Sequence, residues 1–545
     1  MAKKSKKKKV EVNTAKKKDF GFFLGIVGNI LLWAALIGYF VIVPFYLSDG
    51  YKSVSTDKFN CYMFISKWAG IIIGGFVVLY FALWGMTREE IKVYKPLWKM
   101  DLSVLAFIAL MAVSHAFSDY KAVGTKADGN FYYEGSLWGT SGWYMGLMTM
   151  LVAVGMYFAV SRFFKFTKLV FIPIVACGMV QFIWGILNRY GIYPIDMTDA
   201  SIAYLATLGN INWFCGYATI IVPILLGLFW SERRNLFRIL YGIGLYISFV
   251  MVIVNGSDSG IVASAVTMFA LMLFSIKDAK KLVGFSDAML VFSLSSITVF
   301  ALDKLYPGVR NYEASLTEVL AKGYIGFGLL IVFLVVRFFA SLCVLGKCKL
   351  PDGFVKKGAR IFLIIAGAGV FLSVLLITIN TLTNGALPLI GKNPLFLFTD
   401  DWGSKRGATW KSGWYTFRDI SFIKKLIGVG PDCFFFALVR IEDAFNCATA
   451  SFGSARLTNA HNEILTLLVN NGIFGTLAFV SMVVFSIKAS VKELDKKPCF
   501  IMFILVTVMY LANNVFSFEQ ITSTPLYIMM LGILGAAVVR EYQEG

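Results

Sequence analysis

One histidine stands where proton-transfer chemistry is easiest to place. The chain has only two histidines, and His461 lies in TNAHNEILTLL, where a polar segment turns into an apolar run. An imidazole can take or give a proton near neutral pH. A helix that begins here would also present free N–H groups and a positive dipole end, which attract anions. Asn462 and Glu463 fall in the first turn, where they either contact a ligand or simply satisfy helix N–H groups.

The segment before His461 carries cations that suit a phosphate ligand. Arg406 lies in KRGATWKSGW, four residues before Trp410, which is helical spacing, and Arg440 and Arg456 follow in the same segment. Arginine binds phosphate through paired hydrogen bonds. The predicted chemistry is attack by a hydroxyl group on a carbon that bears a phosphate or pyrophosphate leaving group. His461 would be the base, and Arg406 would stabilise the charge that develops on the leaving group.

Other features of this segment have weaker signals. Gly428 and Gly430 in LIGVGPDCF predict a tight turn that allows close backbone approach. Cys433 and Cys447 are candidates for a disulfide, while the absence of any C-x-x-C pair argues against a metal or redox motif, and no cofactor is expected. Each site residue also has a purely structural explanation, because a lone histidine often caps a helix and external arginines often contact lipid headgroups. The second histidine, His115, is expected to be structural.

The elements that must position these residues are membrane helices. The chain is 58% hydrophobic and its mean hydropathy is +0.72. Apolar runs of about 20 residues recur, and a helix of that length crosses the hydrocarbon core. The predicted fold is an all-α, polytopic bundle of 12 to 14 spans. The fourteen candidates are 20–46, 66–87, 102–118, 141–160, 168–187, 213–230, 239–255, 260–276, 283–301, 323–345, 361–382, 464–487, 499–516 and 522–539.

The net charge of +19 is explained by topology rather than by nucleic-acid binding. Basic residues gather in alternate short loops, as the positive-inside rule expects, so both termini are predicted to be cytoplasmic. Residues 1–19 form a basic tail that is either a plain topology signal or a contact for anionic membrane lipid. The bundle then occupies residues 20–382, a large external loop 383–462, and the last spans with a short tail 463–545.

The loop 383–462, between the eleventh and twelfth spans, is the expected catalytic region. Loops this long are usually functional or disordered. Its Trp, Phe and Gly content indicates order, and SGWYTFRDISFIKKLI (412–427) predicts a helix lying at the membrane surface.

The combination of the arginine and tryptophan, GVG and AHNEILTLLVNNGIFG resembles the O-antigen ligase and polymerase superfamily of bacterial envelopes. Two further stretches are similar to that family, GNINWFCGYATIIVPILLG (209–227) and NNVFSFEQITSTPLYIMMLGILG (513–535). The resemblance covers residues from about 208 to the C-terminus. It implies a bacterial cell-membrane glycosyltransferase, with His461 matching the essential loop histidine and Arg406 the arginine near the pyrophosphate.

The resemblance also implies the partners. The donor is a glycan on undecaprenyl pyrophosphate, the acceptor a glycan, lipid or cell-wall hydroxyl, and other envelope polysaccharide enzymes are further expected partners. No metal or cofactor is implied. One departure is NGSDSGIVAS (255–264), which has Asp258 where the family often has Ser-Arg. A pyrophosphate contact is therefore missing or comes from Arg440 or Arg456.

Three functions remain open at this stage. A ligase and a polymerase need the same donor site, and the sequence does not separate them. A transporter of such lipids would carry no chemistry, and is expected to show charged residues or broken helices near the middle of the bilayer. The polar residues gather at the outer face instead, which favours an enzyme.

Overall fold

The computed structural model describes residues 25–87, 98–121, 123–127, 130–199, 201, 203–276, 278–310, 316–348 and 352–539. The basic tail predicted for residues 1–19 and the last six residues of the chain lie outside this part.

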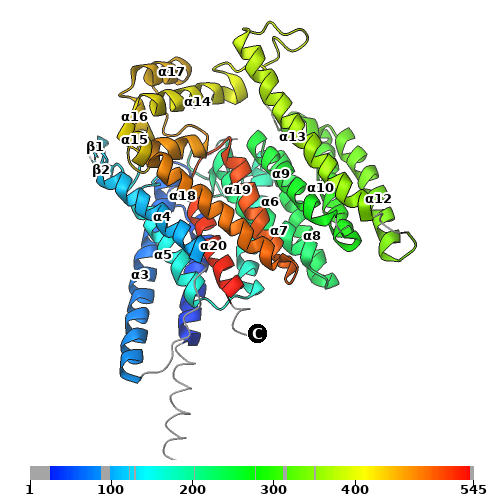
Figure 1. Cartoon of the computed structure of the whole chain (residues 1–545), viewed down its shortest axis with the longest axis horizontal. Coiled ribbons are helices and arrows are strands. Elements are labelled where there is room, and N and C mark those ends of the chain that lie inside the picture. The colour runs from blue at the N-terminus through cyan, green and yellow to red at the C-terminus, as the bar shows by residue number, and fades with distance from the viewer. Residues whose placement is uncertain are drawn as a thin grey trace, which may run out of the picture.

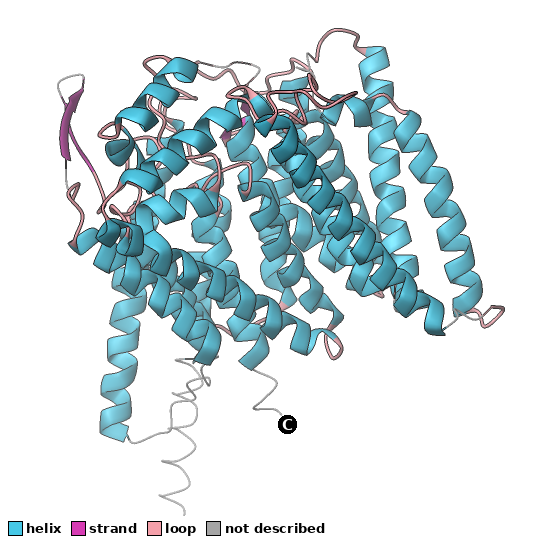
Figure 2. Cartoon of the chain, turned by 45° about the horizontal axis from the view of Figure 1, so that its top comes forward, coloured by secondary structure: helices cyan, strands magenta, loops and turns pink. Residues whose placement is uncertain are grey.

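The described chain is a bundle of apolar helices with only two short strand pairs (Figures 1 and 2). Strands β1 (Val123–Ala127) and β2 (Asn130–Glu134) pair antiparallel, as do β3 (Tyr204–Leu205) and β4 (Gly209–Asn210). The helices of the bundle are the N-terminal helix (Gly25–Phe45, which includes η1 Gly38–Ile42 and α2 Val43–Phe45), α3 (Val54–Thr87), α4 (Trp98–Ala116), α5 (Leu147–Phe163), η2 (Lys168–Val170), α6 (Phe171–Arg189), α7 (Ile211–Ser231), α8 (Asn235–Val254), α9 (Asp258–Ser275), α10 (Ala279–Leu305), α11 (Leu316–Ala321), α12 (Tyr324–Val344), α13 (Asp352–Leu382), α18 (Glu463–Leu494), η3 (Pro498–Phe500), α19 (Ile501–Asn514) and α20 (Thr524–Val539).

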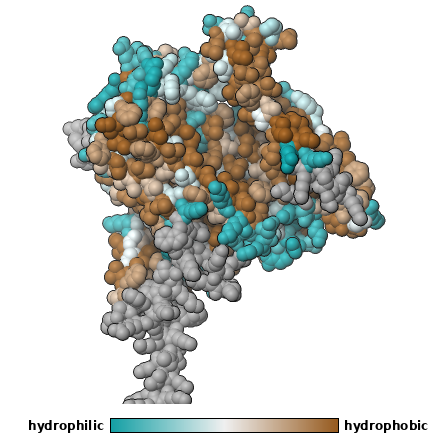
Figure 3. Space-filling view, in the orientation of Figure 1, coloured by the Kyte–Doolittle hydropathy of each residue, from teal (hydrophilic) through white to brown (hydrophobic). Residues whose placement is uncertain are grey.

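Eleven helices in the described ranges are long and apolar enough to cross a membrane. Three of the fourteen predicted spans correspond to shorter apolar helices, α5, α19 and α20. Nearly every side chain of α19 and α20 is buried, because other helices surround them. Figure 3 shows a broad apolar surface between polar ends. The chain is an all-α, multi-pass membrane protein.

The 80 residues between α13 and α18 form a folded unit at one end of the bundle (Figure 1). They contain α14 (Trp402–Asp419), α15 (Phe422–Ile427), α16 (Phe434–Leu438) and α17 (Glu442–Phe452). This region has its own small hydrophobic core, which includes Val429, Phe434 and Leu438. The expected order is present, but the single helix predicted for 412–427 is two helices. Its chain turns at Ile420, and the Ser421 side chain accepts a hydrogen bond from the Lys424 N–H at the start of α15.

Helix α18 differs from the straight span predicted for residues 464–487. Its backbone leaves the helical region at Gly472 (φ 68°, ψ −176°). Residues 473–494 alone make a helix about 33 Å long, which is enough to cross the hydrocarbon core. The part before Gly472 packs against Val429 and Gly430, which lie between α15 and α16, and the part after the break is long enough to cross a membrane without it.

Candidate functional site

Arg406 is held by an unusual left-handed turn. Gly403, Ser404 and Lys405 all have positive φ, between 58° and 69°, immediately before it. Left-handed backbone costs about 1–2 kcal/mol for a residue with a side chain, so this turn must be held in place by its surroundings. The carbonyl oxygens of Gly403 and Ser404 accept hydrogen bonds from Arg406 Nη1 (3.2 and 3.4 Å), and Phe516 O accepts from Nε (3.2 Å). Nη2 has no hydrogen bond within the described part of the chain, so it remains available to a ligand.

Trp410 joins Arg406 to His461. It lies one turn after Arg406 on α14, as the spacing predicted, and its Nε1 donates to the backbone carbonyl of His461 (3.4 Å). The Trp410 ring stacks on Phe516 at 5.9 Å between centroids and also contacts Trp402 at 5.4 Å. This aromatic cluster positions the arginine and the histidine on one side of the folded unit.

His461, two residues before the start of α18, adopts a strained backbone conformation. Its φ is 49°, and its N–H donates to the side chain of Asn459 (3.0 Å). The ring meets Phe518 edge to face at 5.0 Å between centroids. The ring nitrogen Nδ1 is buried and has no hydrogen-bond partner among the described residues. A buried, unbonded imidazole nitrogen is costly for stability alone, which favours a functional role.

Burial and charge both keep His461 neutral. Burial and then the positive charge of Arg406 lower the pKa of His461 to about 3, against a weaker opposing effect of the Asn459 backbone. Burial likewise lowers the pKa of Arg406, while the negative charge of Asp258 acts in the opposite direction. Asp258 stands where the resemblance expects an arginine, and in this chain it supplies a counter-charge for Arg406. Its carboxylate also accepts the Leu316 N–H (2.8 Å).

The connection between α19 and α20, residues 515–523, contacts both Arg406 and His461. Residues 517–523 are buried, although they are not helical in the manner of a span. Non-helical backbone inside a membrane protein is tolerated where protein or a water-filled site surrounds it. This connection supplies the Phe516 carbonyl to Arg406 and the Phe518 ring to His461.

Glu519, in the same connection, was not singled out from the sequence. It is 8% exposed, and within the described part of the chain its carboxyl has no hydrogen bond. Burial, followed by the negative charges of Glu463 and Asp432, raises the pKa of Glu519 well above its ordinary value. The available signal was a single carboxylate in an otherwise uncharged connection, SFEQITSTP, between two apolar runs.

Asn462 and Glu463 lie beside His461, but their polar groups are already occupied. Asn462 Oδ1 accepts the Leu465 N–H (2.9 Å), so it caps α18, and its Nδ2 donates to Val515 O (3.1 Å). Buried Glu463 accepts hydrogen bonds from Tyr510 (2.7 Å) and from Asn514. Both residues tie α18 to α19, which supports the structural interpretation of their positions.

Gly428 and Gly430 pack against the break in α18 instead of facing His461. Backbone N–H groups of Val429 and Gly430 donate to the carbonyls of Val469 and Asn470 (3.0 Å each). Gly428 has φ 88°, and a Cβ atom there would lie 2.2 Å from Asn470 O. The GVG turn is therefore required by close backbone packing, which accounts for both glycines without a ligand.

Arg440 and Arg456 are engaged elsewhere. Arg456 makes a two-pronged ion pair with buried Glu134 (2.9 and 3.2 Å). Arg440 places its guanidinium 4.7 Å from the ring centre of Tyr120. No described contact joins either residue to His461 or Arg406, so neither replaces the missing arginine at position 258.

The remaining predictions concern cysteine and metal. Cys433 and Cys447 are both free thiols and do not pair. Cys433 lies near the carbonyls of Tyr120 and Pro431, whereas Cys447 lies near that of Ala408. The described residues contain no group of three His, Cys, Asp or Glu side chains placed to hold a metal ion. His115 bonds Ser136 Oγ through Nδ1 (2.7 Å), in keeping with a structural role.

Comparison with known proteins adds no assignment. No protein-family model matches the chain, and no curated protein matches it.

Proposed function

We propose that the protein is a membrane glycosyltransferase that moves a glycan from undecaprenyl pyrophosphate to an acceptor hydroxyl at the outer face of a bacterial cell membrane. The observation that carries the proposal is the pairing of a neutral, strained imidazole with an arginine that has an unused N–H group. His461 and Arg406 supply these groups at one end of an apolar bundle, where a lipid-linked anion would present its headgroup.

The residues have distinct roles in this reaction. The acceptor oxygen forms a bond to the anomeric carbon, and the bond from that carbon to the pyrophosphate oxygen breaks with its electron pair. The acceptor proton passes to neutral His461. The leaving group becomes more negative, and Arg406 stabilises it through Nη2. Trp410 and Asp258 orient these two residues and balance their charge without touching the reacting atoms.

The test uses purified protein in liposomes with an undecaprenyl-pyrophosphate oligosaccharide and its acceptor. His461→Ala should abolish release of the lipid pyrophosphate. His115→Ala is the matched control, because it removes the only other histidine, and it should retain activity. Folding of each variant is checked by its thermal unfolding in detergent.

Polymerisation of lipid-linked units is the second candidate, since it requires the same donor site. A ladder of products would establish it, and a single transferred unit would establish ligation. The break in α18 does not favour a transporter, because the 22 residues after it are about long enough to cross the bilayer by themselves, which would place the break away from the middle of the bilayer. Movement of intact donor across the bilayer in both histidine variants, with no release of pyrophosphate, would overturn the enzyme proposal.

A further inference from the structure

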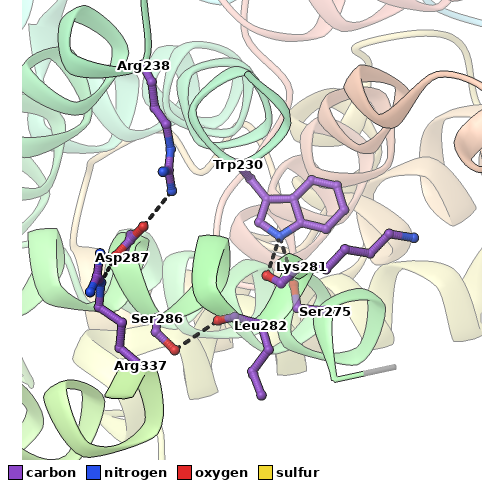
Figure 4. Close-up of polar contacts among 8 residues, drawn as sticks. All are labelled: Trp230, Arg238, Ser275, Lys281, Leu282, Ser286, Asp287 and Arg337. Atoms are coloured by element: carbon purple, nitrogen blue, oxygen red, sulfur yellow. Dashed lines mark hydrogen bonds and ion pairs between the residues drawn. The ribbon is translucent and has the colours of Figure 1, made fainter. Parts of the chain in front are cut away.

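A second charged cluster lies at the end of the bundle opposite α14–α17. Asp287 on α10 stands between Arg238 of α8 and Arg337 of α12 (Figure 4). Its Oδ2 accepts from Arg238 Nη2 (2.6 Å) and its Oδ1 from Arg337 Nε (2.5 Å). Two guanidinium groups share one carboxylate, so the cluster has a net charge of +1.

The position of this cluster along its helices makes the excess positive charge energetically costly. Asp287 lies about 12 Å along α10 from the first residue of the helix, and Arg337 about 10 Å before the end of α12. These positions fall near the boundary between headgroups and acyl chains. Charged side chains at this depth are costly unless they are paired or reach the interface. One excess positive charge therefore calls for an anionic partner.

The two arginines have N–H groups to offer that partner. Arg337 has a side chain that is 46% exposed, and its two Nη groups have no hydrogen bond within the described ranges. Arg238 is held in place because its guanidinium lies 5.1 Å from the ring centre of Phe229. Its Nε is buried, but its Nη1 has no hydrogen bond within the described ranges and is the group that can reach a ligand. The unused donors match the oxygens of a phosphodiester.

The surrounding helix ends are fixed. Trp230, at the end of α7, donates from Nε1 to Ser275 Oγ of α9 (2.9 Å) and to the carbonyl of Lys281 on α10 (3.2 Å), as Figure 4 shows. This brace sets where α10 starts relative to α7 and α9. The cluster is consequently a preformed site rather than a pair of loose surface arginines.

We infer that Arg238 and Arg337, held by Asp287, form a binding site for the phosphate of an anionic phospholipid in the leaflet opposite the candidate catalytic site. A lipid is the partner because Arg337 projects from an apolar, outward-facing helix, and a membrane provides anionic headgroups at that depth. The inference does not depend on the proposed transferase activity.

The test measures lipid retention by native mass spectrometry on the purified full-length protein. Phosphatidylglycerol is titrated against phosphatidylcholine with the same acyl chains. The wild type should retain phosphatidylglycerol preferentially. Arg337→Gln and Arg238→Gln should each weaken that binding about tenfold or more, as expected for loss of the charge-assisted hydrogen bonds between that arginine and the phosphate. Each single variant leaves a neutral arginine–aspartate pair, so the helices stay joined.

Arg233→Gln is the matched control, because Arg233 is an exposed arginine at the same end of the bundle. It should leave retention unchanged. Equal retention of both lipids by the wild type, or unchanged phosphatidylglycerol binding in both cluster variants, would overturn the inference. Displacement of the lipid by millimolar inorganic phosphate would also overturn it, since the site would then bind a free anion.

Discussion

The sharpest test of the candidate site is the pH dependence of transfer. An ordinary imidazole has a pKa of 6.5. At pH 5 only about 3% of such a group is neutral, and a base of that kind would lose activity about 30-fold between pH 8 and pH 5. His461, with a pKa of about 3, is about 99% neutral at pH 5. We therefore expect kcat/KM to stay nearly flat across this range.

The same reasoning predicts how the profile changes when the cation is removed. Arg406→Gln deletes a positive charge that lowers the pKa of His461, so the acidic limb of kcat/KM should move to higher pH. In the donor complex the pyrophosphate offsets the charge of Arg406. The acidic limb of kcat should therefore lie at higher pH than that of kcat/KM in the wild type.

The assay is initial-rate release of lipid pyrophosphate from pH 3 to 8, in liposomes of constant ionic strength, so that the acidic limb is included. A Glu519→Gln background removes a buried carboxyl of the α19–α20 connection whose pKa is raised, so that its titration does not contribute. A 30-fold loss with an inflection near 6.5 that is unmoved by Arg406→Gln would refute the argument. It would mean that His461 is neither desolvated nor coupled to Arg406.

Three further outcomes are expected. Arg406→Lys keeps the positive charge but loses the paired N–H donors of the guanidinium, so KM for the donor should rise about tenfold or more while the protein folds normally. Glu519→Gln should flatten the pH dependence of the melting temperature. Because the pKa of Glu519 is raised in the folded protein, its contribution to the free energy of unfolding is full below about pH 4.5, where the carboxyl is protonated in both states. That contribution is lost as the pH rises, by up to about 1.4 kcal/mol per pH unit. Gly428→Ala should lower the free energy of unfolding by more than about 3 kcal/mol, because its Cβ would lie 2.2 Å from Asn470 O in addition to the strain of a positive φ. Gly453→Ala, with φ 60° and nothing within 4 Å of its Cβ, carries the backbone strain alone and should cost about 1–3 kcal/mol, as measured by thermal unfolding.

The sequence predicted the helices well because apolar length is a local property. Each of the fourteen predicted spans has a helix in the structure, and the segment before His461 is flanked by α13 and α18 as expected. Helix breaks were harder to predict. The bend at Gly472 depends on the GVG turn packing against it from more than 40 residues away in the chain, which no local pattern reveals.

Within the site, the residue types predicted which side chains could bind a ligand, but not which of them are already paired with another side chain. Arg456 has the same side chain as Arg406, yet Glu134 neutralises it from a distant part of the chain. Asp258 was noticed only as a departure from a resemblance, whereas the structure gives it an electrostatic effect on Arg406. Which arginine is available depends on tertiary pairing, and pairing is not encoded in the spacing of either residue.

The buried connection between α19 and α20 explains why His461 is neutral and how Arg406 is held beside it. It covers His461 with Phe518, which removes water from the imidazole, and it fixes Arg406 through the Phe516 carbonyl. The same covering that weakens His461 as a base would strengthen every interaction with a bound anion. An apolar, closed site therefore has a weak base and a strong anion site when empty. Binding of a pyrophosphate donor would reverse that imbalance, so that the base becomes effective only when the leaving group is in place.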